Sequence, residues 1–141
     1  MVSKIDHVGI LVDDVAVNAE VFKHLGLEIG AIERVPEFGV EIAFIRVRES
    51  LVELVEPVDR SGDIASDLEK ADGTALLHHV AFRVDDIEAT LAALRRSGVA
   101  LADNEPRSGA GGAKVVFLDQ ADANGIRIEL VERDAEVAFQ E

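Results

Sequence analysis

The sequence predicts an α+β fold made of two β-α-β-β-β modules related by a pseudo-two-fold axis. Two observations carry this prediction. The segment around His7 recurs around His79 at an offset of 72 residues, and Glu53 recurs as Glu129 at an offset of 76 residues. Each half also shows the same order of patterns, with a Val/Ile-rich strand, an amphipathic helix and further strands. A repeat this long with consistent offsets indicates a duplicated unit.

The first module begins with the pattern of a strand over residues 4–12. Asp13-Asp14 then supply side-chain acceptors of the kind that cap the start of a helix, which we expect over about 15–25. The remaining strands of this module are expected near 27–34, 40–47 and 50–56.

The second module repeats this order, with Asp85-Asp86 again placed before the helix. We expect a strand over 77–84, a helix over 87–97 and strands near 99–103, 114–119 and 125–132. We expect a single domain over residues 1–141, in which repeats at about 3–57 and 75–133 are joined by 58–74, with a short helix in the join.

The composition excludes several classes of function. The chain has 141 residues, 48% of them hydrophobic, and a formal net charge of −14, so its surface would repel nucleic acid and anionic membranes. There is no Cys, which rules out disulfides and thiolate metal sites. No apolar run approaches the roughly 20 residues that span a bilayer. We therefore expect a soluble, cytoplasmic protein without nucleic-acid or membrane partners.

Four polar residues in apolar strands are the candidate functional residues. His7 and His79 hold equivalent places in the first strands of the two modules, and Glu53 and Glu129 are equivalent in the last strands. Pairing the modules about a pseudo-two-fold axis would bring two imidazoles and two carboxylates together. Burying two neighbouring carboxylates is unfavourable without compensation, which a divalent cation provides. The sequence therefore predicts a metal site formed by all four residues.

The donor set also limits the choice of metal. Two neutral imidazoles and two carboxylates suit a borderline divalent ion, with coordination positions left open for a substrate. We expect Co²⁺, with Mn²⁺, Ni²⁺, Zn²⁺ or Fe²⁺ as alternatives.

Longer motifs resemble those of the vicinal oxygen chelate (glyoxalase/bleomycin resistance/dioxygenase) superfamily, and most of all its methylmalonyl-CoA epimerases. The resemblance covers residues 3–133, and it rests on Ile5-Asp6-His7-Val8-Gly9-Ile10, Glu53-Leu54-Val55-Glu56-Pro57, the segment His78–Ile87, and the run Glu105–Leu118 with its Gly-x-Gly-Gly-x-Lys core. It implies two modules that form an incomplete barrel around a metal, and a protein that is commonly a homodimer.

The resemblance also implies a reaction. A metal-dependent epimerase would interconvert (R)- and (S)-methylmalonyl-CoA by proton abstraction at C2 through a metal-stabilised enolate. Glu129 matches the family carboxylate that is both ligand and acid–base group. Some members carry another catalytic Glu where this chain has Ile42, beside Glu41, so we assign Glu53 as the second base.

The glycine-rich loop is the candidate for binding an acyl-CoA. Such loops are often plain turns, but here Arg107 and Lys114 flank Gly111 and Gly112 in an acidic chain. We assign these four residues to substrate binding. Against this, Asp119-Gln120-Ala121-Asp122 stands where the family often shows a His-Pro-Lys segment.

Two alternative functions remain open at this point. A glyoxalase-I-like lactoylglutathione lyase would use the same His and Glu set and a similar enediolate. A non-catalytic small-molecule-binding protein of the resistance type would dispense with the metal.

Overall fold

The computed structural model describes residues 1–72 and 74–138, and it divides into two compact units. Unit 1 consists of Met1–His7 and His79–Val137, and unit 2 consists mainly of Val8–His78. The boundary cuts through β1 (Val2–Val12), so the first half of this strand belongs with the second sequence repeat. The prediction of one domain over residues 1–141 stays a prediction.

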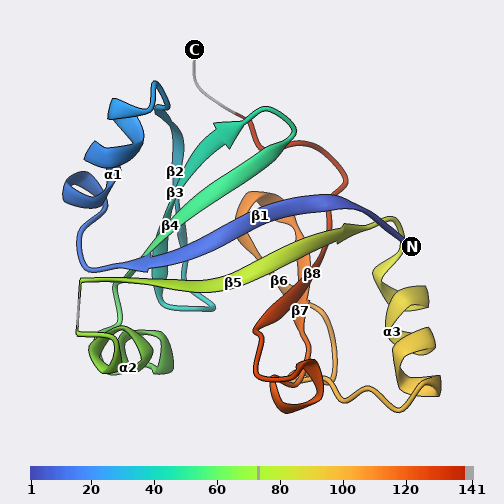
Figure 1. The fold of residues 1–141 in the computed structure, drawn as a ribbon. Coiled ribbons are helices and arrows are strands. Elements are labelled where there is room, and N and C mark those ends of the chain that lie inside the picture. The colour runs from blue at the N-terminus through green and yellow to red at the C-terminus, as the bar shows by residue number, and fades with distance from the viewer. Residues whose placement is uncertain (73, 139–141) are drawn as a thin grey trace. The chain divides into compact units, whose positions relative to one another are not determined.

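Unit 2 is a sheet with one helix packed on it. Its strands follow the order β2-β3-β4-β1, and β2–β3 and β3–β4 are antiparallel. Figure 1 shows α1 beside these strands, where Val15 and Ala19 pack against Ala43, Ile45 and Leu54. The elements of this unit beyond β1 are α1 (Val15–His24), β2 (Ile29–Val35), β3 (Val40–Val47), β4 (Ser50–Pro57) and α2 (Asp63–Lys70).

Unit 1 repeats this design with shorter strands. The order here is β1-β5-β8-β7-β6, and β5 and β8 are parallel, whereas β7 is antiparallel to both of its neighbours. Ile87 and Leu91 of α3 pack against Val84, Val116 and Leu130 of the sheet. Its elements are β5 (Ala75–Val84, whose first residues lie in unit 2), α3 (Ile87–Arg96), β6 (Arg107–Ser108), β7 (Lys114–Phe117) and β8 (Ile128–Glu132), with short 3₁₀ helices η1 (Ala110–Gly112) and η2 (Ala121–Ala123).

The β-α-β-β-β order of both modules, the three predicted helices and most predicted strands are confirmed. The strand predicted near 99–103 is wrong, because only Leu101 forms a bridge there, to Leu118. Turn-forming residues follow it, and the next strand is β6, which starts after Pro106. None of the helices described is long and apolar enough to cross a membrane.

The starts of α1 and α3 are each held by an equivalent pair of acidic side chains, one Asp and one Glu. Asp14 caps α1 by accepting a hydrogen bond from Val17 N, and Asp86 caps α3 through Ala89 N, each at 3.0 Å. The last strand of each module adds a second acceptor: Glu56 Oε1 accepts from the N–H of the first residue of α1, at 2.9 Å. Glu132 Oε1 does the same at the start of α3, at 3.0 Å. The second glutamate of each Glu-Leu-Val-Glu motif therefore ties a strand to a helix.

We predict that Glu132→Ala lowers the free energy of unfolding by about 1 kcal/mol, because it leaves the first N–H of α3 without its acceptor. Urea denaturation followed by circular dichroism measures the change. Glu132→Gln retains an acceptor oxygen, so it should lose clearly less. Equal stability of the Ala variant and the wild type would contradict the assigned role.

Candidate metal centre

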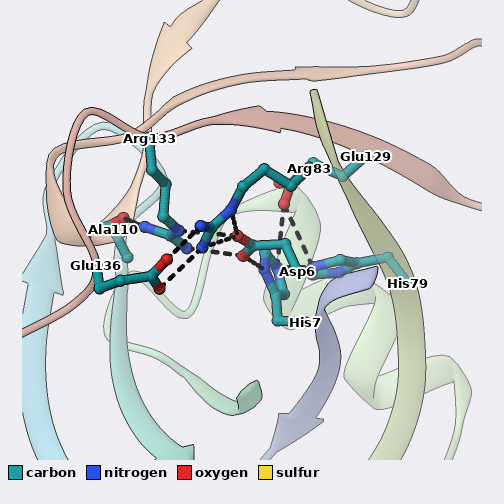
Figure 2. A network of polar contacts seen from close by, with 8 residues as sticks. All are labelled: Asp6, His7, His79, Arg83, Ala110, Glu129, Arg133 and Glu136. Atoms are coloured by element: carbon teal, nitrogen blue, oxygen red, sulfur yellow. Dashed lines mark hydrogen bonds and ion pairs between the residues drawn. The ribbon is translucent and has the colours of Figure 1, made fainter. Parts of the chain in front are cut away.

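Three predicted ligands of unit 1 lie together in the structure. His7 comes from β1, His79 from β5 and Glu129 from β8, and their side chains are at most 8% exposed. His7 Nε2 lies 3.0 Å from Glu129 Oε1 and 3.1 Å from His79 Nε2, and His79 Nε2 lies 3.9 Å from the same carboxylate oxygen. The three side chains could hold one metal ion. Figure 2 shows them converging on one point.

The register of the strands explains this convergence. Ala81 on β5 is paired with Glu129 on β8, and His79 shares the face of Ala81 because alternate strand residues point the same way. On the other side of β8, Phe117 is paired with Glu129. The Phe117 ring packs edge-on against the His79 ring, with ring centroids 5.4 Å apart. The carboxylate thus lies between a small side chain and an aromatic one.

Asp6 sets the hydrogen-bonding state of His7. Its Oδ1 lies 2.7 Å from His7 Nδ1, and both side chains are buried. An ionised carboxylate only accepts hydrogen bonds, so Nδ1 carries the proton. In neutral His7 the lone pair is then on Nε2, the nitrogen that faces Glu129 and His79.

This arrangement fits a divalent cation. The Nε2 lone pair of neutral His7 points at a carboxylate oxygen 3.0 Å away, and two acceptors at that distance repel each other. A positive centre between them, a proton or a metal ion, removes the repulsion. Two imidazole nitrogens and a carboxylate oxygen are donors that borderline divalent ions prefer.

Asp6 is in turn held by two arginines. Arg133 makes a two-point contact with it, Nε to Oδ2 at 3.0 Å and Nη2 to Oδ1 at 2.9 Å. Arg83 Nε donates to Oδ2 at 2.9 Å, and its other side pairs with Glu136. Burial alone would raise the pKa of Asp6, but hydrogen bonds from His7 and Arg133 and the charge of Arg133 hold it far below its ordinary value. The hydrogen bonds that Arg83 donates to Glu136 lower the pKa of Glu136.

Glu53, the fourth predicted ligand, lies on β4 of unit 2. It is 3% exposed and is paired with Phe44 of β3. Ile42 shares this face, because it is two residues from Phe44, whereas Glu41 points away and pairs with Arg34 at 3.2 Å. Glu41 is therefore no substitute for a base at position 42. The role of Glu53 as ligand and base stays a prediction.

The predicted substrate-binding residues fall into two places. Arg107 on β6 and Lys114 on β7 line one cavity of about 580 Å³, because these two strands pair. Arg95 lines it too, and Glu88 and Glu105 add negative charge. Gly111 and Gly112 belong to η1 and are not among the residues that line this cavity. The assignment of all four residues to substrate binding stays a prediction.

The sequence reasoning missed Asp6 and Arg133. Asp6 lies beside a predicted ligand, and a carboxylate in the middle of a Val/Ile-rich strand was the available signal. Arg133 is the first residue after β8 and lies four residues after Glu129. Nothing in its local sequence indicates that it meets a residue 127 positions away.

Comparison with known proteins identifies the family. The model for the Glyoxalase/Bleomycin resistance protein/Dioxygenase superfamily matches residues 6–117, most of the chain. The chain belongs to this superfamily. Within the superfamily, an ethylmalonyl-CoA/methylmalonyl-CoA epimerase of Cereibacter sphaeroides is 36% identical over 92% of this chain and 98% of its own length.

Solved structures of superfamily members give the same result. The crystal structure of methylmalonyl-CoA epimerase from Mycobacterium tuberculosis is similar with a TM-score of 0.89 and 34% identity, covering 95% of this chain and 90% of that one. A variant of the Streptomyces coelicolor methylmalonyl-CoA epimerase in complex with 2-nitronate-propionyl-CoA has a TM-score of 0.89 and 31% identity, covering 96% and 100%. The predicted fold class and superfamily are confirmed.

We predict that acid destabilises the metal-free protein partly through Asp6. Because folding lowers the pKa of this carboxyl, its contribution to stability is present above the ordinary value of 3.8 and decreases as the pH falls below it. Urea denaturation at several pH values should show stability falling below about pH 4. Asp6→Asn should be less stable at neutral pH and show a shallower decline, and equal slopes would contradict the assignment.

We predict that His79→Ala loses metal while the fold largely remains. Removal of a direct ligand should weaken divalent-ion binding more than the roughly 10- to 100-fold typical of supporting residues. Competition with a chromophoric chelator measures it. His78→Ala is the matched control, because His78 neighbours His79 but points to the other face and lies 3.6 Å from Asp67. Stoichiometric metal in the His79 variant would refute the site.

Proposed function

We propose that the chain is a divalent-metal-dependent epimerase that interconverts (R)- and (S)-methylmalonyl-CoA by removing the proton at C2 and returning it on the other face. The observation that carries this is the group of His7, His79 and Glu129, whose side chains are at most 8% exposed, in a chain of this superfamily. Support comes from relatives that are named epimerases and from the acyl-CoA analogue bound to one of them.

The residues divide the work as follows. When bound, a divalent cation supplies a Lewis acid that offsets the negative charge developing on the thioester oxygen as the α-proton leaves. His7 and His79 would hold the ion, and the carboxylate of Glu129 would both bind it and exchange the C2 proton. Proton return on the opposite face needs a second base, and Glu53 is our candidate because it is a buried carboxylate.

The identity of the ion and the substrate contacts are parts of the same proposal. We favour Co²⁺ from the donor set, with Mn²⁺, Ni²⁺, Zn²⁺ and Fe²⁺ as alternatives. Arg107 and Lys114 put positive charge at the cavity they share, which suits the phosphates of an acyl-CoA, and we assign Gly111 and Gly112 to its binding as well. Homodimer formation and a cytoplasmic location also stay predictions.

The central prediction is deuterium uptake. Incubation of the Co²⁺-loaded protein with methylmalonyl-CoA in D₂O should place deuterium at C2, because abstraction and return exchange this proton with solvent, and NMR or mass spectrometry measures it. Glu129→Gln should lower the rate by roughly 10²- to 10⁴-fold, the usual contribution of a general base.

The exchange assay, together with two further measurements, separates the alternative functions. No exchange at C2, together with turnover of a hemithioacetal, would identify a glyoxalase-I-like lyase. Purified protein without a divalent ion, and without thermal stabilisation when one is added, would identify a non-catalytic binding protein.

A further inference from the structure

The three strands that supply the metal ligands also supply a second, buried polar group. β1 carries Asp6 next to His7, β5 carries Arg83 four residues after His79, and Arg133 follows β8 four residues after Glu129. Figure 2 shows the carboxylate of Asp6 between His7 and the two guanidinium groups. Side-chain exposure is 0% for Asp6 and 2% for Arg133.

The contacts of Asp6 use both of its oxygens fully. Oδ1 accepts from His7 Nδ1 and Arg133 Nη2, and Oδ2 accepts from the Nε atoms of Arg133 and Arg83. A two-point arginine contact fixes the plane of a carboxylate, and lysine cannot reproduce it. The orientation of the His7 ring is thereby fixed through Asp6.

Arg133 also reaches the glycine-rich loop. Its Nη1 donates to the carbonyl of Ala110 at 2.9 Å. A Cβ at Gly111 would lie 2.8 Å from the same Nη1 and 2.9 Å from Val137 Cγ2, so an added side chain would force Arg133 and Val137 to move. The loop and the carboxylate that orients His7 are therefore in contact with one guanidinium group.

We propose that Asp6 and Arg133 are positioning residues for the metal ligand His7, and that Arg133 couples the conformation of the loop at residues 110–112 to metal affinity. The proposal deepens the proposed metal-dependent function and rests on it. Support of a ligating histidine by a carboxylate typically changes metal affinity 10- to 100-fold. A coupled loop would let a ligand on the glycines alter how tightly the ion is held.

A purely structural role for the ion pairs makes different predictions. Buried ion pairs contribute little net stability compared with apolar replacements, so stability alone does not distinguish the two roles. The hydrogen-bond donors do distinguish them. In Asp6→Asn the amide oxygen satisfies most guanidinium donors at the Oδ2 position, where the Nε atoms of Arg133 and Arg83 both donate. The amide NH₂ then takes the Oδ1 position, facing His7 Nδ1 and the single donor Arg133 Nη2. His7 would carry its proton on Nε2, and this proton would have to leave before a metal could bind there, which weakens metal binding.

The first experiment measures this tautomer directly. In ¹⁵N-labelled, metal-free protein, long-range ¹H–¹⁵N spectra should show His7 protonated on Nδ1 in the wild type and on Nε2 in Asp6→Asn. Metal affinity should fall 10- to 100-fold in the same variant. Glu136→Gln is the control, because it changes the outer partner of Arg83 and leaves the Asp6–His7 contact in place. An unchanged tautomer with unchanged affinity would overturn the role of Asp6.

The second experiment tests the loop with two matched glycines. Gly111 has φ +72° and Gly112 has φ +74°, so an alanine at either position would have the left-handed backbone that side chains rarely adopt. A Cβ added at Gly111 meets Arg133, whereas a Cβ added at Gly112 has no atom within 4 Å. We expect chelator competition to show metal affinity about tenfold weaker in Gly111→Ala, at the lower end for supporting residues, and within about twofold of wild type in Gly112→Ala.

Equal effects of the two alanines on affinity would overturn the coupling, and melting temperatures of the metal-free variants control for loss of fold. A wild-type protein that takes up no divalent ion would instead refute the proposed function. In that case the tautomer measurement, which needs no metal, still decides whether Asp6 orients His7.

Discussion

The buried carboxylate of Asp6 is surrounded only by hydrogen-bond donors, and the chemistry of the site follows from that arrangement. Because two guanidinium groups keep it ionised, it can only accept from His7, which leaves the other imidazole nitrogen as an electron-pair donor. That nitrogen faces a carboxylate and a second imidazole, so the group is suited to binding a cation. Three neighbouring strands of unit 1 maintain the whole arrangement.

Duplication and divergence are both visible in this site. The repeat preserves a histidine in each first strand and two glutamates in each last strand, and the second glutamate of each pair caps a helix. The supporting group is not duplicated. By the same offsets, His78 stands where the first module has Asp6, and Pro57 stands where the second has Arg133. Only His7, then, has a carboxylate immediately before it in sequence to orient its ring.

The sequence alone predicted what depends on local pattern. Strand alternation, the helix caps and the recurring His and Glu positions predicted both modules. They also predicted three ligands that lie together in the structure. These signals could be recognised because each is a pattern within a short stretch of sequence. The prediction of a strand near 99–103 was wrong because the apolar stretch there pairs with a neighbouring segment at one residue only, Leu101. Arg133 was missed because its partner is set by strand register, which no local periodicity encodes.

The charges of the group have a consequence for the order of events. With neutral histidines, two guanidinium groups stand against the three carboxylates of Asp6, Glu129 and Glu136, so the ensemble is anionic without a metal and cationic with a divalent one. A ligand that carries its own carboxylate meets repulsion in the first state and attraction in the second. Binding of a divalent ion would therefore reverse the sign of the summed charge of these side chains, which favours binding of an anionic ligand after the metal.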